Sequence, residues 1–93
     1  MIEHPKVSVS VISYNQEKYI GDCLQSILEQ QVDFPIEIIV GDDASRDATQ
    51  TIILDYQGRH PDIIRSILRE KNTGGTENYY GVVALCKGEY IPY

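Results

Sequence analysis

The fold is decided by residues 36–47, whose sequence is IEIIVGDDASRD. The stretch begins with a run rich in β-branched residues, which predicts a buried strand ending near Val40. A glycine and two acidic residues follow, and Asp47 with Gln50 three positions later resembles the capping box at the start of a helix. The stretch therefore predicts a strand, an acidic loop and a helix, as in a β-α-β unit with parallel strands.

The same alternation of strand and helix continues on both sides of this stretch. Residues 7–13, VSVSVIS, alternate like a strand, and Asn15 offers an N-cap to the helix after them. Further on, Thr76 is predicted to cap a third helix, with Gly88 in the left-handed position after its end. The predicted order is strand 7–13, a helix between Asn15 and residues 33–35, strand 36–40, a helix between Asp47 and Gly58, strand 63–68, a helix between Thr76 and Gly88, and a strand over 89–93. This order predicts a Rossmann-like α/β fold, with three α/β/α layers around a mostly parallel sheet.

Polar residues follow three of the predicted strands at the point where each strand ends. In an open parallel sheet, ligands bind outside the carboxyl ends of the strands. These residues are therefore predicted to line a ligand site along one edge of the sheet. They are Ser13, Tyr14 and Asn15 after the first strand, Asp42 and Asp43 after the second, and Arg69, Asn72 and residues 73–75 after the third.

Each of these residues also has a purely structural interpretation. A carboxylate of the Asp42–Asp43 pair either accepts an N–H or O–H from a nucleotide or caps the turn through a local hydrogen bond. Tyr14 either stacks on a base or packs in the core. Asn15 caps a helix, contacts a ligand, or does both, while Arg69 is either a ligand contact or a solvated charge. Position in the sequence alone leaves these alternatives open.

The composition excludes several classes of function. The chain has 93 residues and a formal net charge of −6, which disfavours nucleic acid as a partner. A nucleotide diphosphate bound near the carboxylates would need a cation between them. No apolar run is long enough to span a membrane, and residues 1–6 lack the apolar core of a signal peptide, so a cytoplasmic protein is expected. Cys23 and Cys86 fall at apolar helix positions and are expected to be small buried thiols.

Four short stretches together resemble the family 2 glycosyltransferases, which have the GT-A fold. They are VSVSVISYN at 7–15, EIIVGDDASRD at 37–47, NTGG at 72–75 with Asn78, and GEYI at 88–91. The resemblance implies that residues 1–93 are the N-terminal, nucleotide-binding part of such a domain. It implies a nucleotide-diphosphate sugar as donor, commonly a UDP-sugar, a glycan or glycolipid as acceptor, and a place in polysaccharide biosynthesis.

The resemblance also implies roles for individual residues. The segment around Tyr14 would lie against the base, with Ser13 and Asn15 in the same cleft and Glu17 closing that side. Asp43, or Asp42, would bind the uracil and the ribose. The residues that would approach the base or the diphosphate are Arg69, Asn72 and Asn78.

The chain departs from the family pattern in three places. Ala44 stands where the family usually has glycine, and Ile12-Ser13 where it often has Pro-Thr. The carboxylate motif that holds Mn²⁺ or Mg²⁺ in the family follows the strand that Tyr90 begins, and it would lie beyond Tyr93. The ligands of the divalent cation, the acceptor site and the general base are therefore expected outside this chain.

This chain is accordingly expected to recognise the donor without transferring sugar by itself. The complete enzyme is expected to invert the anomeric configuration and, in a longer protein, to lie at the periphery of a membrane. An uncovered edge around residues 90–93 predicts a homodimer.

Two other classes of protein share the predicted fold. One is a non-catalytic nucleotide-binding or regulatory α/β module. The other is a dehydrogenase-like cofactor domain, against which the missing Gly-x-Gly-x-x-Gly pattern after the first strand counts.

Overall fold

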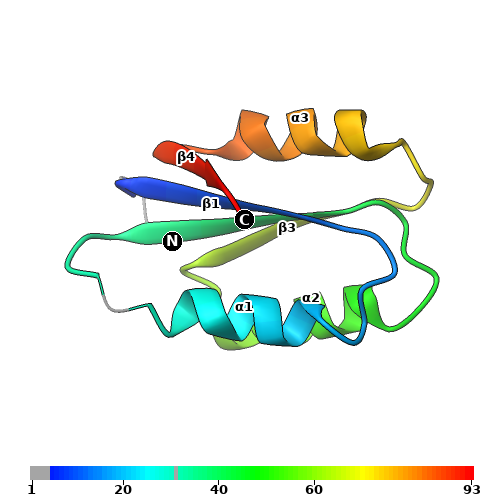
Figure 1. Cartoon of the computed structure of the whole chain (residues 1–93), viewed down its shortest axis with the longest axis horizontal. Helices are drawn as coiled ribbons and strands as arrows, with labels where there is room; N and C mark the ends of the chain where they lie inside the picture. Colours follow the sequence, from blue (N-terminus) through cyan, green and yellow to red (C-terminus); the bar gives the residue numbers. More distant parts are fainter. Residues whose placement is uncertain (1–4, 31) are drawn as a thin grey trace.

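The computed structural model describes residues 5–30 and 32–93. The four strands form one sheet in the order β3-β2-β1-β4, and every neighbouring pair is parallel. Helices α1 and α2 cover one face of this sheet and α3 covers the other (Figure 1). The predicted three-layer α/β/α fold is therefore confirmed. The elements are β1 (Val7–Ser13), α1 (Ile20–Leu28), β2 (Ile36–Asp42), α2 (Thr49–Arg59), β3 (Ile64–Leu68), α3 (Gly75–Leu85) and β4 (Glu89–Pro92).

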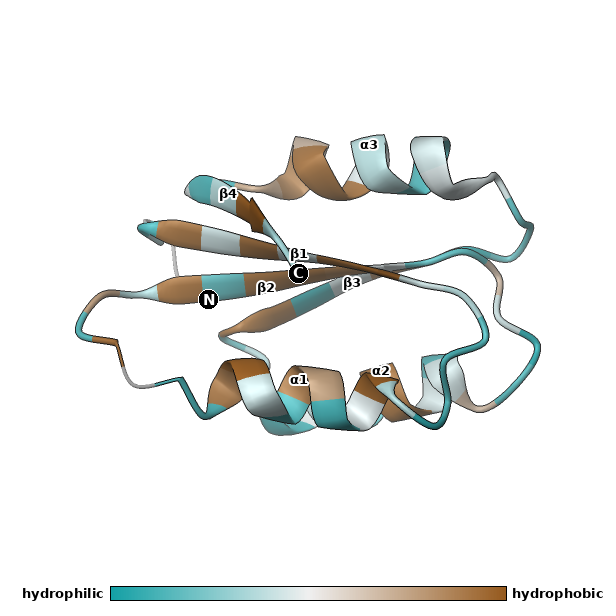
Figure 2. Ribbon diagram, viewed as in Figure 1, coloured by the Kyte–Doolittle hydropathy of each residue, from teal (hydrophilic) through white to brown (hydrophobic). Residues whose placement is uncertain are grey.

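The two faces of the sheet differ in polarity because successive side chains of a strand point to opposite sides. The face toward α1 and α2 is apolar and forms the hydrophobic core, and Figure 2 shows the brown segments of those helices against the strands. The face toward α3 carries Ser8, Glu37, Arg65 and Arg69. The buried core residues are Val9, Val11, Ile20, Leu24, Ile27, Ile38, Val40, Ile53 and Ile64.

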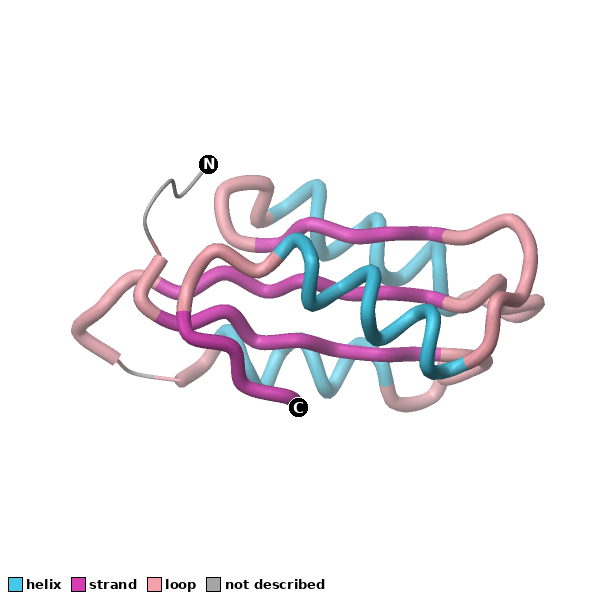
Figure 3. Tube along the Cα trace, turned by 90° about the horizontal axis from the view of Figure 1, so that it is seen from above, coloured by secondary structure: helices cyan, strands magenta, loops and turns pink. Residues whose placement is uncertain are grey.

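Helix α3 lies across the second face of the sheet (Figure 3) and is held to β2 through the first half of the helix. The buried Asn78 donates from Nδ2 to the carbonyl oxygen of Gly41 at 2.9 Å. A Cβ at position 41 would lie 2.4 Å from Val82 Cγ2 and 2.5 Å from Asn78 Oδ1, so only glycine lets the helix come this close.

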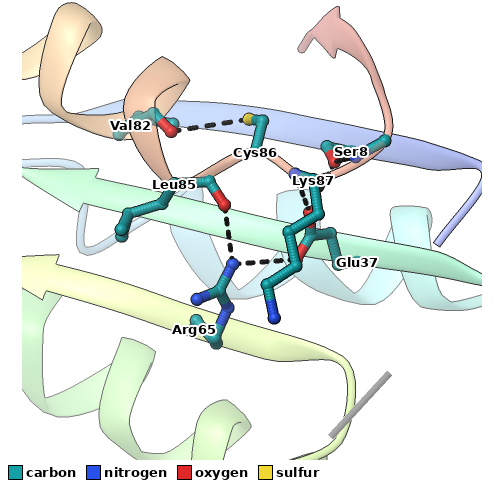
Figure 4. A network of polar contacts seen from close by, with 8 residues as sticks. Ser8, Glu37, Arg65, Val82, Leu85, Cys86 and Lys87 are labelled. Carbon is teal, nitrogen blue, oxygen red and sulfur yellow. Dashed lines mark hydrogen bonds and ion pairs between the residues drawn. The ribbon is translucent and has the colours of Figure 1, made fainter. Parts of the chain in front are cut away.

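The end of α3 is fastened to β2 as well, by the buried carboxylate of Glu37 (Figure 4). This carboxylate accepts hydrogen bonds from Ser8 Oγ at 2.5 Å, Arg65 Nη2 at 2.9 Å and the backbone N–H of Lys87 at 2.7 Å. The same Arg65 nitrogen donates to the carbonyl oxygen of Leu85 at 2.7 Å. The last turn of α3 is thus tied to three strands through one network.

Both cysteines are free thiols. Burial raises the pKa of the Cys23 thiol, and burial together with the nearby Glu37 charge raises the pKa of Cys86. Both thiols stay protonated at neutral pH, but both are only half-buried, so the expectation of fully buried thiols is not met. Cys23 lies in α1 as predicted, whereas Cys86 follows the end of α3.

The predicted start of the first helix is wrong. Helix α1 begins at Ile20, and Asn15 stands outside it with a left-handed φ of 51°. The side chain of Asn15 accepts from the backbone N–H of Arg46 at 2.9 Å, so it links two loops instead of capping a helix. The helix ends at Leu28, before residues 33–35, which were predicted to end it. Gln31, which the sequence pattern included in the helix, lies outside the described residues.

The predicted capping box of the second helix is also wrong. Asp47 accepts from the backbone N–H of Thr49 at 2.9 Å, but the Gln50 amide does not complete the box. It donates instead to Asp42 Oδ2 at 2.8 Å and to the carbonyl oxygen of Arg69 at 3.1 Å. Glycine 58, predicted to close the helix, lies within α2.

The structure differs from the prediction at both ends of the third helix. Helix α3 starts at Gly75 after Gly74, whose φ of 91° turns the chain, so Thr76 lies inside the helix and does not cap it. Gly88 is not the left-handed residue after the helix. A Cβ there would lie 2.7 Å from the carbonyl oxygen of Pro5, so Gly88 allows close contact with the start of β1.

Candidate functional site

Two adjoining pockets lie where β1, β2 and β3 end. The first has a volume of about 570 Å³ and the second about 410 Å³. Tyr14 and Asn72 line both of them, so the two pockets form one continuous cleft along the carboxyl edge of the sheet. This is the edge at which the sequence predicts a ligand site.

The two consecutive aspartates at the end of β2 have separate surroundings. Asp42 is completely buried on the side of α2. Its Oδ1 accepts from the hydroxyls of Ser13 at 2.7 Å and Ser45 at 2.6 Å, and its Oδ2 from Ser45 N–H at 2.9 Å and Gln50 Nε2 at 2.8 Å. Four internal donors occupy both oxygens, which leaves Asp42 no position for a ligand.

Asp43 points toward α3 and lines the second pocket. Its Oδ1 accepts from the backbone N–H and the hydroxyl of Thr73, at 2.6 and 2.9 Å, and its Oδ2 accepts from the N–H of Gly74 at 2.8 Å. Only 4% of the residue is exposed. Because Oδ2 has a single donor, it retains an acceptor position that a ligand N–H or O–H could use.

The ionised form of Asp43 is favoured by its surroundings. The hydrogen bond from the Thr73 N–H, followed by those from the Thr73 hydroxyl and the Gly74 N–H and by the positive charge of Arg69, lowers the pKa of this carboxyl. These effects outweigh its desolvation. Asp43 is therefore a negatively charged acceptor at neutral pH.

The loops after β1 and β2 are joined by several hydrogen bonds. Asn15 N–H donates to Ser45 Oγ at 2.7 Å, and Gln16 N–H donates to Thr49 Oγ1 at 2.8 Å. Glu17 N–H donates to Asp47 Oδ2 at 3.3 Å. These contacts hold Tyr14, which is 43% exposed, at the boundary between the two pockets.

The other residues singled out from the sequence differ in how they reach the cleft. Ser13 is buried and directs its hydroxyl to Asp42, while Asn72 is exposed and donates from Nδ2 to the Asp43 carbonyl oxygen at 3.1 Å. Arg69 lines the first pocket, but its Nε donates to Asn78 Oδ1 at 3.2 Å. Asn78 is completely buried, and its Nδ2 donates to the carbonyl oxygen of Gly41.

Glu17 is placed differently from the residues of the cleft. It lies on the exposed turn before α1, outside the lining of both pockets. Its recorded contact is the backbone bond to Asp47. The structure thus brings Tyr14, Asp43 and Asn72 together at the cleft and leaves Glu17 at its margin.

Sequence reasoning missed two residues that organise this site, Ser45 and Gln50, and it placed Thr73 in the site without its bonds to Asp43. All three donate to one of the two aspartates. For Ser45 a signal was available, because an aspartate side chain commonly accepts from nearby backbone N–H groups in a turn, as Asp42 does from Ser45. Gln50 and Thr73 reach their aspartates from other segments, so no local sequence pattern predicts these bonds.

The cleft carries positive charge although the chain as a whole is acidic. Arg46, Arg69 and Lys71 line the first pocket together with a single acidic residue, Glu70. Cations at the wall of a cleft attract anionic ligands such as phosphates. The local charge therefore suits an anionic ligand better than the net charge suggests.

The described residues contain no group of three or more histidine, cysteine or acidic side chains placed to hold a metal ion. Within residues 5–30 and 32–93, no helix has both the length and the apolar character needed to cross a membrane.

The parallel sheet, with its polar cleft at the carboxyl edge, has the arrangement in which open α/β proteins bind their ligands. Residues 8–93 match the family model described as Glycosyl transferase family 2, and the chain belongs to that family. The resemblance inferred from the sequence is therefore confirmed.

Several relatives and solved structures are similar to this chain. An uncharacterised protein of Mycobacterium bovis is 45% identical over 85 residues, which is 91% of this chain and 25% of that protein. The chondroitin synthase of Escherichia coli is 34% identical, over 94% of this chain and 12% of the synthase. This chain thus spans a quarter or less of the length of these two relatives.

The structural neighbours are GT-A glycosyltransferases. S. aureus TarS 1–349 in complex with UDP-GlcNAc has a TM-score of 0.76 and 33% identity, over 94% of this chain and 26% of that one. The mannosyltransferase PcManGT from Pyrobaculum calidifontis, in complex with GDP-Man and Mn²⁺, has a TM-score of 0.76 and 28% identity, over 89% and 25%. The predicted fold class is confirmed by these neighbours.

Proposed function

We propose that this chain binds the nucleotide of a nucleotide-diphosphate sugar, a UDP-sugar first of all, as the donor-recognising part of a glycosyltransferase. The observation that carries the proposal is the Asp43 carboxylate, which is ionised, faces the second pocket and has an acceptor position left on Oδ2. Uracil presents one N–H flanked by two carbonyl groups. That N–H suits the single remaining acceptor of Asp43.

Neighbouring residues supply the other contacts that a nucleotide needs. The exposed ring of Tyr14 offers a face on which a base stacks, an interaction worth about 1–3 kcal/mol. The side chain of Asn72 has a second amide hydrogen and a carbonyl oxygen for the base or the ribose. Arg46 and Lys71, at the wall of the adjoining pocket, favour the negatively charged part of the ligand.

The proposal extends to the reaction of the complete enzyme. A carboxylate base deprotonates a hydroxyl of a glycan or glycolipid, which displaces the nucleotide diphosphate with inversion at the anomeric carbon. A divalent cation, Mn²⁺ or Mg²⁺, stabilises the departing diphosphate when it is bound. A neighbouring structure holds Mn²⁺ with GDP-Man, which supports the cation. The described residues contain no cluster of ligands for such a cation. We propose that the base also lies outside this chain and that the chain is inactive alone.

The biological setting is part of the same proposal. A glycan-building role, in polysaccharide biosynthesis, is supported by the relative that is a chondroitin synthase. We place the reaction on the cytoplasmic side, at the periphery of a membrane in a longer protein. Fractionation of the source cells, with detection of the protein in the cytosolic and membrane fractions, tests this placement.

Calorimetric titration of the chain with UDP, GDP and NAD, with and without Mn²⁺, tests the donor class. UDP is expected to bind more tightly than NAD, and Asp43→Asn is expected to weaken UDP binding by about 10- to 100-fold, because a hydrogen bond to a charged group contributes about 1.5–3 kcal/mol. The matched control is Asp33→Ala, an exposed aspartate in the loop before β2, at the opposite edge of the sheet. Equal UDP affinity in Asp43→Asn and the wild type would contradict the proposed role of Asp43.

We also propose that the chain forms a homodimer through the β4 edge. Strand β4 is the outermost strand beside β1, and Ile91 and Tyr93 are 48% and 61% exposed. They adjoin an apolar groove of about 320 Å³ that also contains Val9 and Phe34. An open strand edge beside an apolar groove favours pairing with a second copy. Sedimentation is expected to show a concentration-dependent dimer, and a monomer at every concentration would exclude it.

A further inference from the structure

The hydroxyl of Ser45 joins the two loops that border the cleft. Ser45 Oγ donates to Asp42 Oδ1 at 2.6 Å and accepts the backbone N–H of Asn15 at 2.7 Å. One oxygen atom therefore connects the end of β2 to the residue that follows Tyr14. Asp42 lines neither pocket and Ser45 lines the first, whereas Asp43 lines the second.

The contact with Asp42 decides which way the Ser45 hydroxyl points. Ser45 Oγ is the donor to Asp42 Oδ1, so the hydroxyl hydrogen of Ser45 points to Asp42. The lone pairs of the oxygen are then directed away from Asp42 and remain available to Asn15. Ser13 and Gln50 hold Asp42 in turn, at 2.7 and 2.8 Å, so the acceptor does not move.

The N–H of Asn15 belongs to the peptide plane that starts at Tyr14. Holding this N–H sets the backbone torsion ψ of Tyr14, and with it the direction from which the ring enters the cleft. Asn15 has a left-handed φ of 51°, a conformation that asparagine adopts more readily than most non-glycine residues. A second contact holds the same residue, the bond from Arg46 N–H to Asn15 Oδ1 at 2.9 Å.

We infer that Ser45, oriented by Asp42, is a positioning residue that fixes the Tyr14 ring for stacking on the nucleobase. The inference rests on the proposed function for its ligand, and it assigns different roles to the two aspartates. Asp43 contacts the nucleotide, and Asp42 acts on it only through Ser45, Asn15 and the ring of Tyr14.

The test is a double-mutant cycle with UDP as the probe, using Ser45→Ala, Tyr14→Ala and the double variant of the chain. Ser45→Ala is expected to weaken UDP binding about fivefold, the equivalent of one ordinary hydrogen bond. In the Tyr14→Ala background the same change is expected to have less than about a twofold effect, because the ring that Ser45 positions is gone. Equal losses in both backgrounds would mean that Ser45 affects UDP binding independently of the Tyr14 ring, and the inference would fail.

A second readout needs no ligand. Amide hydrogen exchange of Asn15 in the free protein is expected to be faster in Ser45→Ala, while Ser66→Ala, which removes a hydroxyl bonded to Gln57 elsewhere on α2, leaves it unchanged. An unchanged Asn15 exchange rate in Ser45→Ala overturns the inference whether or not UDP binds. If Asn15 exchanges faster in Ser45→Ala but the wild type binds no UDP, the proposed function is wrong, and so is the role of Ser45 in base stacking. The link from Asp42 through Ser45 to Asn15 would still stand.

Discussion

Glu37→Ala is expected to lower the free energy of unfolding by about 3–5 kcal/mol, as the removal of one partner from a buried ion pair does. Glu37 is 2% exposed and accepts hydrogen bonds from Ser8, Arg65 and the Lys87 N–H. Alanine leaves these donors without that acceptor, and it releases the link between β2 and the segment after α3. The free energy of unfolding of a native domain is about 5–15 kcal/mol, so this loss is a large fraction of it.

The chain offers a matched control for this prediction in a second ion pair. Asp55 and Arg59 are also 2.9 Å apart, but their side chains are 65% and 53% exposed on α2. Asp55→Ala is therefore expected to change the free energy of unfolding by about 0.5 kcal/mol or less. Urea unfolding followed by circular dichroism measures both variants, and similar losses for Glu37→Ala and Asp55→Ala would show that the buried network contributes little.

The same carboxylate makes the fold sensitive to acid. Burial opposes ionisation of Glu37, but the hydrogen bonds from Ser8, Lys87 and Arg65, with the charge of Arg65, outweigh it and lower the pKa. A carboxyl whose pKa is lower in the folded state stabilises the fold above its ordinary pKa, near 4.5. That stabilisation is lost as the pH falls through the folded-state pKa, so the wild type is expected to lose more stability in acid than Glu37→Ala does.

Gly41→Ala is expected to lower the free energy of unfolding by about 3 kcal/mol, at the upper end of the usual effect of overpacking. The added methyl group would lie 2.4 Å from Val82 Cγ2 and 2.5 Å from Asn78 Oδ1. Both side chains are completely buried, so neither can move into solvent, and a shift of Asn78 also breaks its bond to Arg69. Helix α3 would have to move away from the sheet.

Gly58→Ala provides the opposite case in the same chain. Gly58 lies in the last turn of α2, and a Cβ there meets no atom within 4 Å. Alanine in a helix is favoured over glycine, so this variant is expected to gain about 0.5–1 kcal/mol. Thermal unfolding of both variants measures the contrast, and a stable Gly41→Ala protein would mean that α3 is less tightly packed than its contacts indicate.

The strands, their order along the chain and the three layers could all be predicted from the sequence. Alternation of β-branched residues identifies a strand without reference to the rest of the chain, and parallel strands joined by helices admit few arrangements. The exact helix limits could not be predicted, because the residues that looked like caps have partners elsewhere. Asn15 is bonded to Arg46, and the Gln50 amide is drawn to Asp42.

The candidate site could be predicted as a region but not residue by residue. Tyr14, Asp43 and Asn72 meet in the cleft because the ends of parallel strands share one edge. Alternation along β2 implies that Asp42 and Asp43 point to opposite faces of the sheet. Which of the two carboxylates faces the cleft depends on the positions of Gln50 in α2 and of Thr73 just before α3. Contacts between residues distant in sequence set those positions.

The three contacts that hold α3 against β2 fix the length of the segment between β3 and β4. Asp43 holds the residues before the helix, Asn78 holds the first half of the helix and Glu37 holds the residues after it. Glu37 in β2 and Asp43 directly after β2 are six residues apart, about 20 Å, and α3 with 11 residues is about 16 Å long. One inserted residue would rotate half of the helix by about 100° and detach one end. Natural insertions and deletions in this part of the chain should therefore be absent from α3 and confined to its flanking loops.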